Sequence, residues 1–394
     1  MGLRLPGETG YAAAMNDAVH KGLLPQGLRD LLPPQAEAEA ALVERLMAVL
    51  AGNGYERVEP PLVEFEDNLL SGAGAAMATE TFRLMDPVSQ RMIGVRADMT
   101  PQVARIAATR LAKAARPLRL SYAGQVLRVK GGQLNPERQL GQVGAELIGS
   151  HDIAADVEVL TVAAEALTAV GMTGLSVDLT LPRLVPLVCS ALDLDEERTE
   201  RVRAALDHKD AAAVAAVGGK AATLLGKLLA AAGTVDKTLR TLSALKLPDE
   251  AATELARLAT VCKDVKARAP ALTMTIDPVE NRGFEYHTGI SFSFFTGKAR
   301  GELGRGGRYR AGNGTGEPAT GFTIYSDRVI EALPRPAPPR RLYVPLGSDA
   351  ELVRRLRGEG WVTVAALGSG SDKAEAKRLR CGHSLIGGKI VAVD

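Results

Sequence analysis

The sequence predicts an α+β protein, in which strand-forming and helix-forming stretches lie mostly apart along the chain. Three observations lead to this class. Residues 290–294 alternate apolar side chains with serines, which is the period of a half-buried strand. Residues 190–268 are rich in Ala, Leu and charged residues and poor in aromatics, which predicts a helical insertion. Residues 342–394 alternate strand and helix patterns, which predicts a short α/β tail module.

The first 22 residues are expected to form a loose extension, because they lack the apolar core of a signal peptide. Met15 is a second candidate start residue. No stretch of the sequence reaches the apolar length of a membrane span. The three cysteines are widely spaced and have few histidines nearby, so neither a zinc site nor a disulfide framework is predicted. These observations favour a cytosolic protein without a metal.

The stretch after the extension predicts a Pro-rich turn, a helix and a strand that ends at Pro60-Pro61. Apolar residues recur at helical spacing from Leu42 to Leu50, and Gly52 and Gly54 end the pattern. The elements predicted next are a strand at residues 81–86, a strand at 91–98 and a helix at 100–115.

A β-hairpin is predicted from residues 119–129 and 137–149, because the loop between them, KGGQLNP, is rich in turn formers. Residues 155–171 predict an amphipathic helix that ends at Gly171.

Strand patterns return after the helical insertion, at residues 272–277 and in the first part of residues 319–333. The glycine-rich run GELGRGGRYR at 301–310 lacks the strand-to-helix context of a dinucleotide-binding loop. It is therefore interpreted as a tight turn between antiparallel strands. Residues 334–341, PRPAPPRR, predict a stiff linker.

The charge balance argues against a protein that binds nucleic acid through its overall field. The chain has 48 basic and 46 acidic residues, for a net charge of +2, so RNA binding would require a local basic patch. Basic residues in the tail recur at helical spacing, which is typical of a solvated helix face. Trp361 and Tyr343 lie in apolar strand patterns and are expected in the core, so no tRNA binding is predicted.

Five motifs, taken together, resemble those of class II histidyl-tRNA synthetases. They are RADMTPQVARI (96–106), YAGQVLRVKGGQLNPERQLGQVGAELIG (122–149), NRGFEYHTG (281–289), GRGGRYR (304–310) and GFTIYSDRV (321–329). Their joint order makes the resemblance specific, although each motif alone is weak. The resemblance implies an antiparallel sheet of six or seven strands flanked by helices, formed by residues 23–189 and 269–333, and a self-dimer.

This resemblance implies a pocket for free histidine, which presents an ammonium, a carboxylate and an imidazole. Asp98 and Thr100 would take the ammonium, and Gln142 the same end of the ligand. Glu146 would meet the imidazole edge, and Arg282 would face the carboxylate in a charge-assisted contact. The alternative for each residue is a structural polar group at a sheet end. For Glu146 and Arg282, which apolar strands flank, a ligand role is the preferred interpretation.

Three further residues complete the implied histidine set. Arg128 matches an arginine of the second class-defining motif, and Tyr286 and His287 would line the imidazole side. The synthetases usually have a second tyrosine at the position of His287.

The departures from the synthetase pattern fall on the nucleotide side. Lys130 reverses the charge of an acidic residue, and Arg310 replaces another. Tyr325 stands where the family has a glycine that lets the backbone approach the adenine, so its ring is expected to fill part of the ATP site. Arg328 matches the phosphate-binding arginine, with a helix cap or ion pair as its alternative role.

A synthetase-like core that keeps the amino-acid pocket but loses ATP chemistry resembles the regulatory subunits of ATP phosphoribosyltransferase. The tail is also short for an anticodon-binding domain. The resemblance implies a non-catalytic, cofactor-free subunit that activates the short-form catalytic subunit within a hetero-oligomer, expected to be a hetero-octamer. Histidine would act as the feedback effector of the first step of histidine biosynthesis, through the coupling of two binding equilibria.

Two other functions stay open at this point. An active but divergent histidyl-tRNA synthetase is favoured by Arg128, Arg282 and Arg328 and opposed by Lys130, Tyr325 and the short tail. A structural or RNA-tethering relative without ligands is opposed by the retained acidic and amide residues of the pocket.

Overall fold

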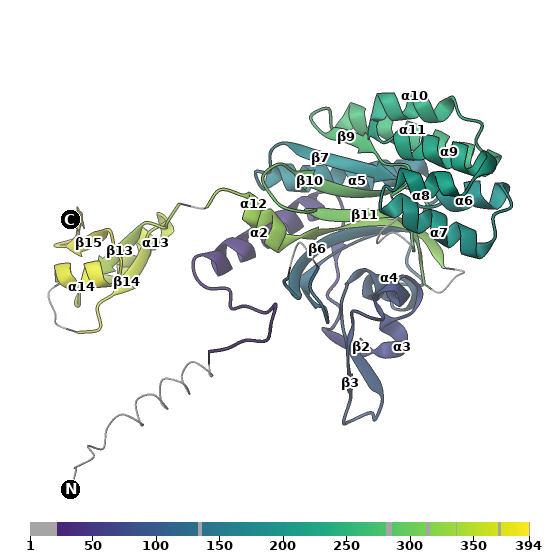
Figure 1. The fold of residues 1–394 in the computed structure, drawn as a ribbon. Helices are drawn as coiled ribbons and strands as arrows, with labels where there is room; N and C mark the ends of the chain where they lie inside the picture. The colour runs from purple at the N-terminus through teal and green to yellow at the C-terminus, as the bar shows by residue number, and fades with distance from the viewer. Residues whose placement is uncertain are drawn as a thin grey trace, which may run out of the picture. The chain divides into compact units, whose positions relative to one another are not determined.

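The computed structural model describes residues 22–132, 136–280, 286–312, 316–335, 337–368 and 372–393. The chain divides into two compact units between Pro334 and Arg335. The first unit contains the large sheet and most of the helices, and the second contains a smaller sheet with two helices (Figure 1). Among the described residues, no helix combines the length and the apolar character that crossing a bilayer needs.

A nine-stranded sheet, in the order β1-β5-β6-β12-β11-β10-β7-β9-β8, organises the first unit. Its strands are β1 Glu56–Arg57, β5 Leu118–Leu127, β6 Gln139–Ile148, β7 Leu175–Thr180, β8 Gly233–Thr234, β9 Thr273–Ile276, β10 Ser291–Thr296, β11 Gly304–Ala311 and β12 Glu317–Tyr325. The six strands from β5 to β7 pair antiparallel, whereas β1 and β9 join them in parallel. The α+β class with an antiparallel sheet is therefore confirmed, and short strands at the edges extend the sheet beyond the six or seven expected.

The strand predicted at residues 290–294 is confirmed as β10, but the prediction that it is half-buried is wrong. Ser291 and Ser293 are 0% and 8% exposed, and Phe292 and Phe294 are each 1% exposed. Both faces of β10 are therefore covered, and its edges pair with β7 and β11. The Ser293 hydroxyl donates to Glu302 at 3.0 Å, which satisfies a polar group on the face that was expected to meet water.

The glycine-rich run is not a tight turn, because its residues from Gly304 onward form β11. A side chain at Gly306 would clash with the ring of Phe292 and the carbonyl of Gly321, and one at Gly321 would clash with the carboxylate of Glu146. Glycine therefore serves here to let strands and buried side chains approach closely, which is its main role inside a strand.

The helices that pack on or beside this sheet include α2 Gln35–Gly52, α5 Ile153–Ala169 and α12 Ser326–Ala332. The stripe predicted for α2 is confirmed, since Leu42, Leu46, Met47 and Leu50 are buried. The helix predicted at residues 155–171 is confirmed as α5, but it is buried on most sides rather than amphipathic. It contacts β12, α2 and α11, which leaves little of its surface to water.

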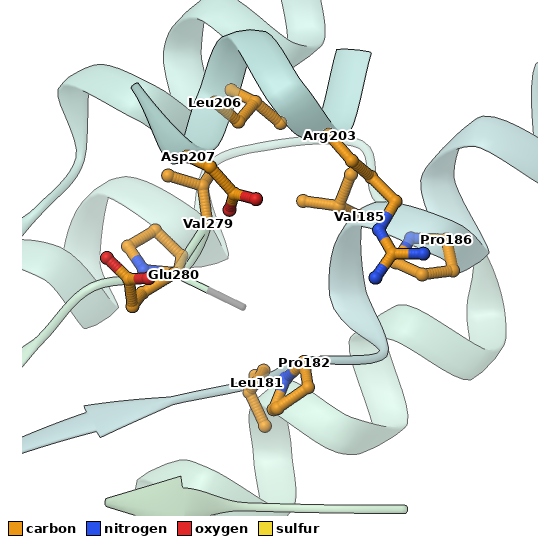
Figure 2. Close-up of a pocket in the computed structure, with 10 residues that line it drawn as sticks. Leu181, Pro182, Val185, Pro186, Arg203, Leu206, Asp207, Val279 and Glu280 are labelled. Atoms are coloured by element: carbon orange, nitrogen blue, oxygen red, sulfur yellow. The ribbon is translucent and has the colours of Figure 1, made fainter. Parts of the chain in front are cut away.

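Among the described residues, six helices lie on one side of the sheet (Figure 1); five fall within the predicted insertion at residues 190–268, and the first lies largely before it. They are α6 Leu184–Ala191, α7 Glu196–Asp207, α8 Ala211–Ala216, α9 Gly219–Ala230, α10 Val235–Ser243 and α11 Asp249–Arg268. The last and longest of them packs against α5. Figure 2 shows the hollow where Val185 of α6 and Leu206 of α7 face Leu181 and Val279. Its volume of about 10 Å³ is room for one water molecule at most.

A second, three-stranded sheet lies between α2 and the hairpin in sequence and has the order β2-β4-β3. Its elements are β2 Val63–Phe65, α3 Glu66–Leu69, η1 Gly72–Met77, β3 Phe82–Met85, β4 Met92–Val95 and the following helix α4 Thr100–Thr109. The helix predicted at 100–115 ends at Thr109. The Arg116 guanidinium instead binds the carbonyls of Leu111 and Ala114, at 3.0 Å and 2.9 Å.

The second unit alternates strands and helices, as predicted, and its sheet has the order β14-β13-β15-β16. Its elements are β13 Arg341–Val344, α13 Ala350–Gly358, β14 Val362–Ala365, α14 Asp372–Arg378, β15 His383–Ile386 and β16 Lys389–Ala392. The single last strand that was expected is a hairpin, because Gly387 and Gly388 turn the chain with positive φ angles of 55° and 79°. Tyr343 is fully buried, as predicted, and Trp361 is partly buried.

Candidate functional site

A buried carboxyl group, Glu146 of β6, lies at the centre of the candidate site. Its side chain is 1% exposed and accepts hydrogen bonds from the hydroxyls of Tyr309 and Tyr122, at 2.9 Å and 3.3 Å. Burial raises the pKa of Glu146 to about 8, because a charge is poorly solvated there. The register that pairs Glu146 with Gly321 of β12 leaves room for this carboxyl, since residue 321 has no side chain.

The Glu146 carboxyl borders a cavity of about 30 Å³, which we name the Glu146 cavity. Its other walls come from the segment before α4 and from β11, β12 and the residues just before β10. The residues that line it include Asp98, Thr100, Tyr286, His287, Tyr309 and Tyr325. The sequence motifs therefore meet in space at one place in the sheet.

Asp98 lies just before the N-terminus of α4, where two neighbouring residues bind its carboxylate. Its carboxylate accepts from the backbone N–H of Thr100 at 2.8 Å and from the side-chain amide of Gln142 at 2.9 Å. Gln142 in turn accepts from the backbone N–H of Met99 at 3.1 Å. Gln142 thus orients Asp98 toward the Glu146 cavity.

Tyr122, Tyr309 and Thr323 belong to the site although they were not among the predicted residues. The Tyr122 hydroxyl lies 2.8 Å from that of Thr323 and 3.2 Å from that of Thr100, so these hydroxyls and Glu146 form one network. Burial, and next the nearby Glu146 carboxylate, raise the pKa of Tyr122 and of Tyr309 well above the usual range, so both phenols stay protonated donors. All three lie within the motifs that resemble those of the synthetases, which is the signal that the sequence offers. Their common face follows from the pairing of three different strands, β5, β11 and β12, with their neighbours.

The aromatic wall of the cavity consists of Tyr286, His287 and Tyr309. The rings of Tyr286 and His287 lie 4.1 Å apart, and Tyr286 meets Tyr309 edge-on at 6.1 Å. His287 is 5% exposed. Arg282, the predicted partner of a ligand carboxylate, lies outside the described residues.

Arg128 does not lie at the Glu146 cavity. It lines a separate, larger cavity of about 540 Å³, which we name the Arg128 cavity, together with Lys130, Arg300 and Arg328. The Arg128 guanidinium lies 3.5 Å from Glu80 and donates to the carbonyl of Ala97 at 3.4 Å. The structure therefore places three of the predicted basic residues together, apart from the predicted histidine ligands.

Tyr325 lines both cavities and ends β12 between them. Its side chain is 7% exposed, so the phenol ring is part of the packed wall. Arg328 follows in the first turn of α12, where it pairs with Glu331 at 3.4 Å and lies 3.8 Å from Asp327. Arg310 points to neither cavity; its guanidinium donates to the carbonyl of Gly316 at 3.1 Å.

The side chains of the Glu146 cavity complement a small zwitterionic ligand with a polar ring. Asp98 supplies a carboxylate for an ammonium, and Glu146 supplies a carboxyl that exchanges a proton near neutral pH. In the described part of the chain, no cluster of His, Cys, Asp or Glu has the makeup of a metal site.

Comparison with known proteins points to one family. Residues 27–329 match the family model described as histidyl-tRNA synthetase. The chain is 60% identical to an ATP phosphoribosyltransferase regulatory subunit of Rhodospirillum centenum, over 94% of this chain and 96% of that protein. It is 57% identical to a protein of the same description from Paramagnetospirillum magneticum, over 96% of this chain and 100% of that protein.

Solved structures agree in fold. An ATP phosphoribosyltransferase regulatory subunit/histidyl-tRNA synthetase from Bacillus halodurans has a TM-score of 0.79 at 24% identity, covering 90% of this chain and 96% of its own. A chain of the ATP phosphoribosyl transferase (HisG:HisZ) complex from Thermotoga maritima has a TM-score of 0.59 at 16% identity, covering 73% of this chain and 97% of its own.

Proposed function

Because the chain belongs to the family of ATP phosphoribosyltransferase regulatory subunits, we propose that it binds free histidine in the Glu146 cavity and thereby regulates the catalytic subunit of that transferase. The observation that carries this proposal is the buried Glu146 carboxyl, which shares one cavity with Asp98 and the aromatic wall. A buried ionisable group beside a second carboxylate is typical of a ligand site and costly as a purely structural feature.

Each end of histidine has a matching group in this proposal. Asp98 and Thr100 take the ammonium, as Gln142 holds the Asp98 carboxylate toward the cavity. Glu146 faces the imidazole, and because its pKa is about 8, the pair shares a proton near neutral pH. Arg282 stays the proposed partner of the ligand carboxylate. Arg128 is no longer proposed as a direct histidine contact, since it lines the other cavity.

Histidine entry requires the cavity to change shape. A volume of about 30 Å³ holds roughly two water molecules, which is less than an amino acid occupies. Asp98, Thr100 and Tyr309 are held by hydrogen bonds, whereas Tyr286 and His287 meet their neighbours through ring contacts, so we propose that Tyr286 and His287 move when the ligand enters. A ligand that binds only a rearranged state shifts the population toward that state, which gives feedback its physical basis.

Regulation then follows from reciprocal coupling. Histidine changes the free energy of the partner's active state, by about 1–3 kcal/mol in typical cases, and the partner's substrates weaken histidine by the same factor. We propose that the chain is itself non-catalytic, forms a self-dimer, and activates the short-form catalytic subunit by assembling with it in a cytoplasmic hetero-oligomer.

A second candidate function is an active histidyl-tRNA synthetase. It is favoured by the Arg128 cavity, whose volume of about 540 Å³ and basic lining suit a nucleotide. It is opposed by Tyr325, whose ring forms the wall between the two cavities. Histidine-dependent exchange of pyrophosphate into ATP separates the two functions, because only a synthetase forms the adenylate.

The direct test of the proposal is calorimetric titration of the protein with histidine, and with Mg-ATP in parallel. Wild-type protein is expected to bind histidine saturably, and Glu146→Gln to bind it at least about tenfold more weakly, because an amide cannot pair with an imidazolium. The matched control is Glu200→Gln, the same change at an exposed residue of α7. Equal affinity of Glu146→Gln and the control would rule out Glu146 as a ligand. Binding of ATP with pyrophosphate exchange would favour the synthetase instead.

A further inference from the structure

A third cavity, of about 400 Å³, lies where the insertion meets the core, and neither the histidine site nor the nucleotide side accounts for it. We name it the Arg310 cavity. Its walls are β11, the residues before β10, the start of α5 and the insertion helix α11. Basic residues dominate its lining, which includes Arg183, Glu254, Arg257, Arg308 and Arg310. Side chains of Arg308 and Arg310 flank Tyr309 in the strand, so they leave β11 on the face opposite to the Tyr309 hydroxyl.

The floor of the Arg310 cavity is a buried cluster in which two guanidinium groups share one carboxylate. Asp156 of α5, 2% exposed, accepts from Arg308 at 2.9 Å and from Arg257 of α11 at 2.9 Å. Arg308 also donates to the carbonyls of Ser150 and Asp152, at 2.8 Å and 3.0 Å. One carboxylate therefore faces two positive charges, of which Arg308 is buried and Arg257 is partly exposed, with a side-chain exposure of 24%.

The rim of the cavity has cations whose hydrogen-bonding capacity is largely unused within the described residues. Arg310 is exposed, and its guanidinium donates one hydrogen bond to another described residue, at the Gly316 carbonyl. The side chain of Arg183 is 46% exposed and lies 3.6 Å from Glu254 and 3.8 Å from Glu250, distances beyond a hydrogen bond. Of the described residues that line the cavity, Glu254 is the one with an acidic side chain.

We propose that the Arg310 cavity binds a small phosphorylated anion, which bridges the core and the insertion. Among the described residues, the four arginines of the lining pair with three carboxylates, those of Asp156, Glu254 and Glu250, so the cavity carries an excess of one positive charge. Arginine forks bind carboxylate and phosphate oxygens in pairs, and a phosphate group has more oxygens and more charge for several arginines to share. A volume of about 400 Å³ lies at the small end of ligand sites and exceeds what inorganic phosphate fills, so pyrophosphate or a small phosphate ester fits the class better.

The test is titration of the full-length protein with pyrophosphate, and with inorganic phosphate in parallel, followed by ³¹P NMR and calorimetry at low ionic strength. Arg310→Ala is expected to raise the Kd roughly tenfold, because it removes charge-assisted hydrogen bonds. Glu254→Gln is expected to lower the Kd several-fold, since it removes the acidic residue that faces the anion. A change in opposite directions at these two positions is a result that damage to the fold does not produce.

Two controls locate the site. Arg201→Ala removes an exposed arginine of α7 that is paired with Glu197 and is expected to leave the Kd unchanged. Lys130→Ala lies in the Arg128 cavity, and a loss of binding in this variant with none in Arg310→Ala would place the anion there and overturn the proposal. Absence of saturable binding, or equal loss in Arg201→Ala, would also overturn it. Histidine affinity of Arg310→Ala is expected to stay intact, so the outcome is independent of the proposed histidine site.

Discussion

A single carboxyl group, Glu146, illustrates how a sheet interior changes acidity. Two phenol hydroxyls donate to it, yet burial outweighs them and raises its pKa to about 8. The free protein therefore holds this group mostly protonated at neutral pH. The imidazole of the proposed ligand exchanges a proton with this carboxyl group. The pKa that burial gives Glu146 therefore links the packing of the sheet to the proposed binding of histidine.

The raised pKa predicts a pH dependence of stability. The unfolded chain loses the Glu146 proton near pH 4.5, whereas the folded chain keeps it to about pH 8, so stability falls as the pH rises through this window. The expected loss between pH 5 and pH 8 is on the order of a few kcal/mol. Urea unfolding at several pH values measures it, and Glu146→Gln should flatten the profile above pH 6.

A second buried acid limits where that comparison is informative. Burial raises the pKa of Asp327 to about 6, so this residue adds a slope of the same sign below pH 6. The Glu146 contribution is therefore measured between pH 6 and 8. Glu200→Gln should keep the wild-type slope there, and a Glu146→Gln profile as steep as that control would contradict the assignment.

At the scale of elements, periodicity predicted what each segment is, but not which of its faces is covered. The hairpin strands, α2 and β10 follow from apolar spacing, because that spacing records the burial of a whole face. It cannot report that β10 lies in the sheet interior, where its serines are buried as well. The error at β11 has a different cause. A glycine-rich sequence is compatible with a turn and with a close-packed strand, so the sequence did not distinguish the two.

The candidate site shows the same division. Asp98, Thr100 and Glu146 were predicted as one group, and they line one cavity. Tyr122 and Thr323 were missed because their place at the site depends on pairing register between β5, β6 and β12, which one sequence does not display. The sequence motifs therefore predicted which residues lie in the sheet better than they predicted which cavity each side chain faces.

Close packing between β6 and β12 makes the glycine at 321 a sensitive position. Gly321→Ala places a methyl group against the Glu146 carboxylate and the Ala145 carbonyl, and is expected to destabilise the protein by about 1–3 kcal/mol. The matched control is Gly226→Ala in α9. A Cβ added there has no atom within 4 Å apart from its chain neighbours and the backbone of its own helix, so stability is expected to rise by about 0.5–1 kcal/mol. Urea midpoints of the two variants should move in opposite directions; a neutral Gly321→Ala would show that the strands are looser than described.

At the scale of the whole molecule, the two compact units are separate stretches of the chain, and the three named cavities belong to the first of them. All residues of the three cavities lie before Pro334, in the unit built on the nine-stranded sheet. The second unit has its own apolar clusters, around Leu342 and around Tyr343. Each unit therefore has the internal contacts that independent folding requires.

This division predicts the outcome of a truncation. A chain that ends at Pro334 retains every strand of the large sheet and the whole insertion, so it is expected to unfold in one cooperative transition. Its urea midpoint should match the corresponding transition of the full-length protein, because the core that is lost belongs to the other unit. Far-UV circular dichroism and tryptophan fluorescence separate the two units, since Trp361 is the one tryptophan of the sequence and lies in the second unit. A truncated chain that is unfolded or aggregated in native buffer would show that the second unit stabilises the first, and the two could not be treated as separate domains.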